Sequence, residues 1–370
     1  PAELRDLVIP STVKNTVIND DDTTTENTYT VSSIIDNCFK DRKDIYTVRL
    51  SGDNVAEKDF VIGNHAFDGC RMLNSFVVDS NVKIKKAGVY SFAETSLVEI
   101  DLKGDLLEIP SYCFNNCSQL KKVSSSALII SSFAFNNCTS LSFEDVSFAD
   151  SFSSLEKIEP FAFLNCSSLL SLQLPVTIKE YLEFSFDETN NLASISFKDG
   201  DTNQSSSLST VDGSLYSISQ SGKKLIYVPS VKDNALSLPD DLYDISISSL
   251  KDNRKISSFS LSQNDKYYVE DGILYEKNDD SLTLLRCPSA KSNKVTVSDK
   301  TTRIEDNAFR YSSLETINLS ENLISVGVSS FSSSLNLQYV TFKKKTKFIG
   351  SKAFENCPSL IKIVMPDYVE

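Results

Sequence analysis

Apolar residues recur along the chain at fixed distances from a central aromatic residue, which we call the anchor. In most units a small residue precedes the anchor, an aliphatic residue stands five positions before it, and another follows five or six positions later. The eleven anchors, most of them 21 to 28 residues apart, are Phe39, Phe67, Phe92, Phe114, Phe135, Phe163, Phe186, Leu250, Phe309, Phe331 and Phe354. Self-similarity at such a period indicates a repeat protein in which each unit stacks on its neighbours.

Positions that correspond between units form columns, and the chemistry of a column indicates its depth. The residue before the anchor is always Ala, Ser or Cys, and nine of the eleven residues five positions before it are Ile or Val. The aliphatic column after the anchor holds only Leu and Ile. We therefore expect the anchors to stack on one another within the core.

A second pattern follows the anchor in most units: an apolar residue, two variable residues, an apolar residue, a variable residue and an apolar residue. Examples are LLSLQL, ending at Leu174, and LETINL, ending at Leu319. This alternation predicts a short strand. One strand, one turn and one short helical or irregular segment per repeat predict an α/β solenoid of the leucine-rich repeat class, with stacked short parallel strands.

The motif A-F-x-x-C-x-x-L followed by L-x-x-I-x-L-P resembles the BspA-type leucine-rich repeats of bacterial and protist surface proteins. Copies include FAFNNCTSL, ending at Leu141, and KAFENCPSL, ending at Leu360. The resemblance covers nearly the whole chain. It implies an extracellular or cell-surface protein that binds a macromolecular partner, as an adhesin does.

Two further segments, Val211–Ser230 and Glu270–Ser289, align with each other, with Gly and Pro 16 residues apart in both. Their D-G-x-L-Y motifs resemble the β-hairpin insertions that interrupt repeat arrays of this family. The expected organisation is one solenoid over 1–370. Its parts are a partial first repeat (1–13), an acidic insertion (14–30), repeats (31–198), a hairpin module (211–230), a degenerate repeat (236–262), a second hairpin module (269–289) and repeats (295–370).

Both ends of the chain fall in the middle of a repeat. Leu4–Pro10 and Leu360–Pro366 match the same part of the unit, yet no anchor motif precedes the first or follows the second. Because solenoid ends normally carry polar capping repeats, we expect a longer full-length protein with a leader and an attachment segment.

The net charge of the chain limits the classes of partner that it can bind. The formal net charge is −13 and the pI is about 4.7, which argues against a nucleic-acid groove or an anionic membrane surface, and we expect no basic patches. No run of about 18 apolar residues is present to span a bilayer, so we expect no membrane insertion.

The eight cysteines admit four interpretations: a catalytic thiol, a metal ligand, a disulfide framework or core residues. Five stand three positions after an anchor and two stand directly before one, in columns where other units carry small residues. Cys287 aligns with Val228 of the other hairpin module. Buried free cysteine behaves as a small hydrophobe, so we expect core thiols.

Catalytic and cofactor motifs are weak. The single histidine, His65, occupies an ordinary repeat position, and paired carboxylates such as Asp240 and Asp241 suit turns. Too few histidines are present for a histidine-rich zinc site, and no Gly-rich phosphate loop occurs. The acidic stretch Asn19–Asn27 suggests Ca²⁺ ligands but lacks the spacing of a known loop, which favours a solvated insertion. The sequence predicts a protein that is not an enzyme and has no cofactor or metal.

Function is then expected on the two variable columns of the strand pattern, which alternate with core residues. These columns consist mostly of Ser and Thr; in one unit Glu144 interrupts the apolar pattern. The candidate binding face comprises Thr47, Arg49, Glu99, Asp101, Lys122, Phe143, Gln173, Asn318, Tyr339 and Lys362. We expect a binding scaffold for a protein or glycan of a host or neighbouring cell; a structural spacer without a ligand and, more remotely, an enzyme are the alternatives.

Overall fold

A computed structural model describes residues 5–20, 22–53, 55–102, 104–144, 146–181, 183–198, 204–246, 248–250, 253–291 and 293–369. Contacts divide the chain into two compact units: unit 1 is Pro1–Leu192 with Ser196–Leu208, and unit 2 is Ala193–Ile195 with Ser209–Glu370. One point of division lies just before β16 (Ser194–Phe197), one lies within it, and one lies within β17 (Leu208–Val211). Each unit is described by itself.

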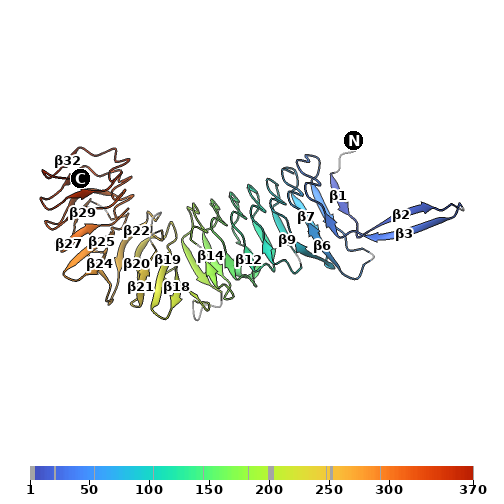
Figure 1. Cartoon of the computed structure of the whole chain (residues 1–370), viewed down its shortest axis with the longest axis horizontal. Helices are drawn as coiled ribbons and strands as arrows, with labels where there is room; N and C mark the ends of the chain where they lie inside the picture. Colours follow the sequence, from blue (N-terminus) through green and yellow to red (C-terminus); the bar gives the residue numbers. More distant parts are fainter. Residues whose placement is uncertain are drawn as a thin grey trace. The chain divides into compact units, whose positions relative to one another are not determined.

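Most repeats of unit 1 contribute two short strands, and the repeat around Phe135 has α1 in place of one of them (Figure 1). The strands with the L-x-x-I-x-L pattern, here called face strands, form a parallel sheet of β1 (Asp6–Ile9), β5 (Thr47–Leu50), β7 (Ser75–Val78), β9 (Glu99–Leu102) and β11 (Lys122–Ser125). A further face strand is β14 (Ser171–Leu174). The predicted solenoid of stacked short parallel strands is confirmed.

The second strand of each repeat, here called the rear strand, was not predicted. Rear strands end at or near the aliphatic column five positions before the anchor. They form two sheets: β4 (Ser33–Ile34), β6 (Lys58–Ile62) and β8 (Val82–Lys86); and β10 (Glu108–Ile109), β12 (Ile129–Ile130), β13 (Lys157–Ile158) and β15 (Glu180–Tyr181). Most span only two residues, too few for alternation to be visible in the sequence.

The segment expected to be helical or irregular consists of turns around the anchor. In the part of the chain that the structure describes, the one α-helix is α1 (Phe148–Ser151). Residues two positions before and two positions after an anchor adopt left-handed backbone, as at Tyr112 (φ +59°) and Asn116 (φ +60°). A right-handed helix cannot continue through such residues, so the chain turns twice at each anchor.

The anchors of unit 1 stack face to face in one column, as predicted. Consecutive rings from Phe39 to Phe186 lie 5.2–5.7 Å apart between centroids. Their interplanar angles are 3° to 20°. Phe114 and Phe135 in the middle of the column are fully buried. The column therefore forms the axis of the hydrophobic core.

All eight cysteines are free thiols. Those three positions after an anchor donate a hydrogen bond to the carbonyl of the preceding anchor: Cys117 Sγ lies 3.0 Å from Phe92 O and Cys138 Sγ lies 3.1 Å from Phe114 O. These thiols link successive turns; four of them fill the core, whereas Cys357, also expected there, is half-buried. Cys38 was expected in the core but is exposed, because its repeat contains β4, the edge strand of its sheet.

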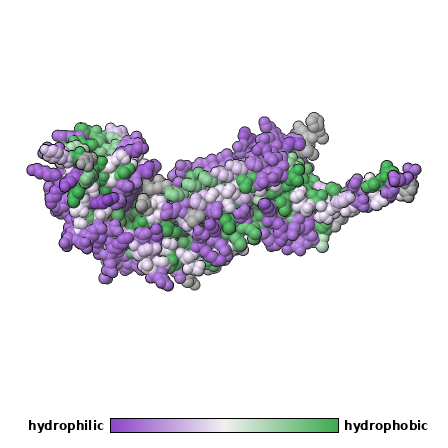
Figure 2. Space-filling view, in the orientation of Figure 1, coloured by the Kyte–Doolittle hydropathy of each residue, from purple (hydrophilic) through white to green (hydrophobic). Residues whose placement is uncertain are grey.

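The segment 14–30, predicted as a solvated insertion, overlaps a two-stranded antiparallel pair of β2 (Thr12–Ile18) and β3 (Thr24–Thr30) with seven residue pairs; residue 21 lies outside the described residues. The hairpin extends from the sheets of unit 1 and exposes apolar as well as polar residues (Figures 1 and 2). Val13, Val17 and Tyr29 are 41–53% exposed. No group of ligands suited to a metal ion occurs among the described residues.

Unit 2 has the same two-strand repeat, with face and rear strands. Its face strands are β20 (Asn234–Ser237) and β22 (Ile256–Ser260) in one sheet, and β26 (Asn293–Thr296), β28 (Leu314–Asn318), β30 (Tyr339–Thr341) and β32 (Lys362–Val364) in another. Phe309, Phe331 and Phe354 form its anchor stack.

The rear side of unit 2 mixes antiparallel and parallel pairs. Strand β18 (Ser214–Ser219) pairs antiparallel with β19 (Gly222–Tyr227), which pairs parallel with β21 (Leu242–Ile245). Strand β24 (Ile273–Asn278) pairs antiparallel with both β23 (Tyr267–Glu270) and β25 (Ser281–Arg286). The sheet continues in parallel through β27 (Thr301–Ile304), β29 (Ser325–Val326) and β31 (Phe348–Ile349).

Candidate binding face

The register of the face strands aligns the two variable columns across each sheet. In unit 1, Thr47 pairs with Ser75 and Arg49 with Val77, while Glu99 pairs with Lys122. Core residues between them point inward, so the variable residues form two rows on the outer surface. Neighbouring members of a row are about 4.8 Å apart along the hydrogen-bonding direction. The repeat thus holds exposed side chains on a regular grid.

Nine of the ten candidate residues lie on this surface. Arg49, Glu99, Asp101, Asn318, Tyr339 and Lys362 are exposed. Thr47, Lys122 and Gln173 are half-buried. Five candidate residues share one sheet of unit 1: Thr47, Arg49, Glu99, Asp101 and Lys122. Asn318, Tyr339 and Lys362 share one sheet of unit 2.

The prediction for Phe143 is wrong. Its side chain is 8% exposed and packs edge-on against Phe148, with ring centroids 5.2 Å apart. The described residues between Leu141 and Phe148 form no strand, and the chain instead enters α1. Glu144, which is exposed where an apolar residue was expected, was the signal in the sequence that this repeat departs from the register.

A shallow depression of about 490 Å³ lies on the face of unit 1 between β7, β9 and β11. Its lining includes Val77, Glu99, Asp101, Lys122 and Ser124. Strands β7 and β9 pair through Phe76 and Ile100. Two carboxylates and one ammonium group beside an exposed valine provide hydrogen-bonding and apolar contacts for a macromolecular surface.

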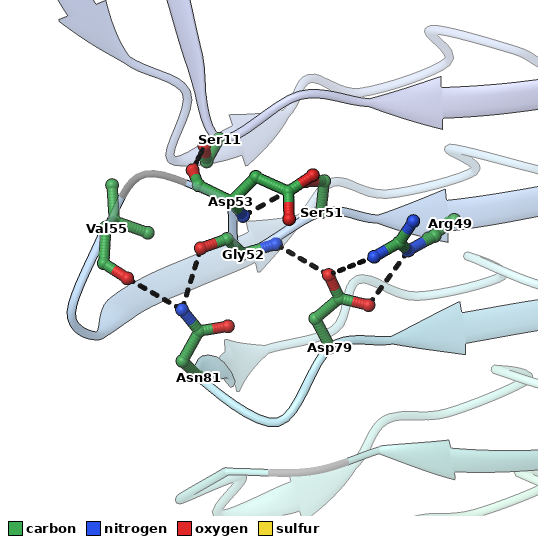
Figure 3. A network of polar contacts seen from close by, with 8 residues as sticks. All are labelled: Ser11, Arg49, Ser51, Gly52, Asp53, Val55, Asp79 and Asn81. Atoms are coloured by element: carbon green, nitrogen blue, oxygen red, sulfur yellow. Dashed lines mark hydrogen bonds and ion pairs between the residues drawn. The ribbon is translucent and has the colours of Figure 1, made fainter.

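A polar network at the carboxyl ends of β5 and β7 holds Arg49 in place (Figure 3). The guanidinium donates two hydrogen bonds to Asp79, 3.0 and 2.9 Å long, and Asp79 also accepts the Gly52 N–H at 2.9 Å. The hydrogen bonds and charge of Asp79 raise the pKa of Arg49 above its ordinary value. Its charge is therefore already paired, so Arg49 is less available to a ligand than its exposure suggests.

The loop after β5 is closed by a second member of the same network, Asn81. Its Nδ2 donates to the carbonyls of Gly52 and Val55, both at 2.7 Å. A Cβ on Gly52 would lie 1.6 Å from Asn81 Oδ1, so only glycine permits this approach. The edge of the face is thus rigid where Arg49 emerges.

A second depression, of about 280 Å³, lies on the face of unit 2. Lys294 and Lys343 line it, although neither belongs to the columns predicted from the sequence. Lys294 was missed because β26 belongs to no unit with a recognisable anchor. The expectation that basic patches are absent is also wrong, because Lys343, Lys344, Lys345 and Lys347 occupy four of five consecutive positions.

Six rings two positions before successive anchors form a second ladder, partly exposed, that sequence reasoning missed. The rings are His65, Tyr90, Tyr112, Phe133, Phe161 and Phe184, with neighbouring centroids 4.7–5.6 Å apart. All six adopt left-handed backbone, which is strained for aromatic residues. Stacking offsets that strain. His65 Nδ1 also lies 2.8 Å from Asp68 Oδ2, so both this contact and its stacking on Tyr90 are structural.

Substituting Tyr112 with Asn is expected to lower the free energy of unfolding by about 1 to 2 kcal/mol. The change removes stacking on Tyr90 and Phe133, worth about 0.5–1.5 kcal/mol for each pair, whereas Asn tolerates left-handed backbone better than Tyr. Urea denaturation followed by circular dichroism measures the difference. Tyr112→Phe keeps both stacks and should stay within about 0.5 kcal/mol of the parent. A stabilising Tyr112→Asn substitution would mean that strain outweighs stacking in this ladder.

An asparagine ladder occupies the column two positions after the anchor. Asn137 Nδ2 donates to Asn116 Oδ1 at 2.8 Å, and Asn165 Nδ2 donates to Asn137 Oδ1 at 2.9 Å. These three residues begin the N-x-[ST] matches of the repeat, and all have left-handed backbone that asparagine favours. Their side-chain amides therefore link successive turns of the repeat by hydrogen bonds.

Comparisons with known proteins agree with this architecture. Solved structures of similar fold include a leucine rich cell surface protein from Faecalibacterium prausnitzii A2-165, with a TM-score of 0.56 and 20% identity, covering 100% of this chain and 83% of that chain. Another is a leucine-rich repeat protein from Bacteroides ovatus ATCC 8483, with a TM-score of 0.50 and 18% identity, covering 99% and 82%. At these identities the likeness concerns the fold alone.

A comparison with curated protein sequences gave no match. Within the described residues, helices long and apolar enough to cross a bilayer are absent. The family described as BspA type Leucine rich repeat region matches in six copies over residues 32–156, 129–264 and 283–370. The chain therefore belongs to the BspA-type leucine-rich repeat family.

Proposed function

We propose that the protein is a non-enzymatic binding scaffold of adhesin type, located at the cell surface or secreted, whose face strands recognise a protein or glycan of a host or neighbouring cell. The proposed location is supported by membership of the BspA-type family and by the F. prausnitzii neighbour, which is a cell surface protein. The recognition surface is proposed to be the two variable columns of the face strands.

The proposal rests on one observation: the surface depressions lie on the variable columns of the face strands. In each unit a shallow depression lies on the face strands, and both depressions are lined by residues of the same two columns. Parallel pairing fixes the backbone beneath them, so little conformational entropy is lost when a partner binds. A broad, open surface of this kind fits a macromolecule better than a small substrate, which is usually enclosed in a deeper pocket.

Replacing Glu99, Asp101 and Lys122 together with Ser is expected to weaken binding to a partner by at least 10-fold, because these charged side chains surround the depression of unit 1. Ser is common in these columns, so the fold should tolerate it. The parent chain is first tested on extracellular-matrix proteins, a glycan array and intact cells. Affinity for each partner found is then measured by surface plasmon resonance.

The matched control replaces Asp59, Lys83 and Glu108 with Ser. These substitutions also remove two acidic groups and one basic group, but from rear strands, where the side chains are likewise accessible to solvent. The control should bind as the parent does. Equal losses in both variants would contradict recognition by the face strands. Absence of any partner would favour the alternative, a structural spacer, to which the many small hydroxyl residues of the two columns are also suited.

A further inference from the structure

Charge is distributed unevenly along this acidic chain. Residues 290–370 carry eleven Lys and Arg against eight Asp and Glu, whereas residues 1–289 carry 26 against 42. The last repeats of unit 2 are thus the basic part of a protein with a net charge of −13. A local reversal of this kind attracts anionic ligands to one place and leaves the remainder of the chain repulsive to them.

The register of unit 2 places part of this positive charge on the binding face. Lys294 pairs with Thr316, Thr316 with Tyr339, and Tyr339 with Lys362, so one row across β26, β28, β30 and β32 reads Lys, Thr, Tyr, Lys. Three interstrand spacings of about 4.8 Å make this row about 14 Å long. The row has an ammonium group at each end and an aromatic ring between them.

The next row supplies uncharged hydrogen-bonding groups. Asn318 pairs with Thr341 and donates from Nδ2 to Thr296 Oγ1 at 3.3 Å. Lys343 follows β30 and joins Tyr339, Asn318 and Lys294 in lining the depression of about 280 Å³. Hydroxyl and amide groups in this position can pair with the hydroxyl groups of a ligand.

The charges of this surface are only partly neutralised. Lys343 pairs with Glu321 at 2.8 Å, and Lys345 Nζ donates to Asn322 Oδ1 at 2.7 Å. Among the described residues, Lys294, Lys344 and Lys362 form no ion pair and lie exposed. The acids on the adjoining segments are Asp299, Glu315 on β28, Glu321 and Asp367, fewer than the six lysines at 294, 343–345, 347 and 362. An excess of positive charge therefore remains available.

We propose that the face of unit 2 binds a short segment of an anionic glycan, one carrying carboxylate or sulfate groups, along the row from Lys294 to Lys362. Tyr339, 44% exposed, provides an apolar ring surface for a sugar, the lysines neutralise its acidic groups, and Thr316 and Asn318 contact its hydroxyls. A glycan is favoured over a nucleic acid because the basic surface is confined to a short row in a chain that otherwise repels a long polyanion. This inference rests on the proposed function and names the ligand class for unit 2.

The test measures binding of the intact chain to three immobilised probes: heparin as the sulfated glycan, polygalacturonate as the carboxylated glycan and dextran as the neutral control. We expect binding to at least one of the first two and none to dextran. The double substitution Lys294→Ser with Lys362→Ser should weaken that binding at least 10-fold and reduce its salt dependence. Tyr339→Ser should weaken it several-fold with the salt dependence unchanged, because a ring contact releases no counterions.

The matched control is Lys83→Ser with Lys85→Ser, which removes two accessible lysines from a rear strand of unit 1 and should leave glycan binding unchanged. An equal loss in this control, or a Tyr339→Ser variant that binds as the parent does, would show non-specific ion exchange and overturn the proposal. Tighter binding of a single-stranded oligonucleotide would overturn it in favour of nucleic acid.

The two proposals fail independently. If neither anionic glycan binds but the triple substitution at Glu99, Asp101 and Lys122 still abolishes capture of a partner, only the ligand class assigned to unit 2 is wrong. If heparin or polygalacturonate binds and depends on Tyr339, while the triple substitution has no effect on any partner, the face of unit 1 is not the recognition surface and the inference for unit 2 is supported.

Discussion

Substituting Phe135 with Ala is expected to lower the free energy of unfolding by about 3–5 kcal/mol, the usual effect of truncating a buried aromatic residue. The ring is fully buried between Phe114 and Phe163, with centroids 5.4 and 5.2 Å away, and it contacts Phe152 edge-on at 6.3 Å. Its removal leaves a cavity in the middle of the anchor column and breaks the stack in both directions. Repeats on either side cannot close the gap, because their spacing is fixed by strand pairing.

Ser171→Ala provides the matched control. Ser171 is exposed on the face strand β14, so its substitution should change the free energy of unfolding by no more than about 0.5 kcal/mol. Both variants are compared with the parent by urea denaturation followed by circular dichroism, since the chain lacks tryptophan. Similar effects at the two positions would contradict the assignment of anchors to the core and variable columns to the surface.

The columns of the repeat made the core predictable from the sequence. A residue that recurs at one position of every unit must either stack on its equivalents or face solvent, so small, aliphatic and aromatic columns identified the buried positions. The same argument located most of the candidate face, because the residues that alternate with Val48 and Ile100 must point outward. Strand register, normally difficult to predict, follows here from the repeat itself.

Features set by the backbone rather than by the columns were not predictable. The rear strands are too short to show a period, and the turns that replace a helix depend on left-handed residues such as Tyr112, an aromatic residue seldom found in that conformation. The ring column of His65 and Tyr90 looked variable because other units carry Asn, Ser or Lys there. The chemistry of a column therefore indicated how deeply its residues are buried, but not their local backbone conformation.

The candidate site shows the same limit. Exposure of Glu99 and Asp101 follows from alternation, but the pairing of Arg49 with Asp79 depends on a loop whose path the repeat does not determine. Lys294 could not be placed on the face, since β26 has no anchor of its own. The departure at Phe143 arises where a single unit replaces its strand with α1.

Raising the pH from 8 to 10 is expected to destabilise unit 1 by several kcal/mol. Burial raises the pKa of Cys70 and Cys117 to about 11, and that of Cys113, Cys138 and Cys166 further above the ordinary value of 9.0. A thiol whose pKa is raised by folding contributes its full stability below the unfolded pKa and loses it as the pH rises toward the folded pKa. At pH 10, above the unfolded pKa and below the folded one, this loss is on the order of 1 kcal/mol for each thiol.

The combined loss from five such thiols approaches the whole free energy of unfolding of a typical domain. The urea midpoint of unfolding, measured in the presence of a reductant, should therefore fall steeply between pH 9 and pH 10. The control replaces all five cysteines of this set with Ser, which already occupies the equivalent columns at Ser91, Ser185 and Ser334. This variant loses some stability at pH 7 but should change little between pH 8 and pH 10. If its midpoint falls as steeply as that of the parent, ionisation of other groups causes the alkaline loss. The thiols would then be core residues whose protonation has no measurable effect on unfolding.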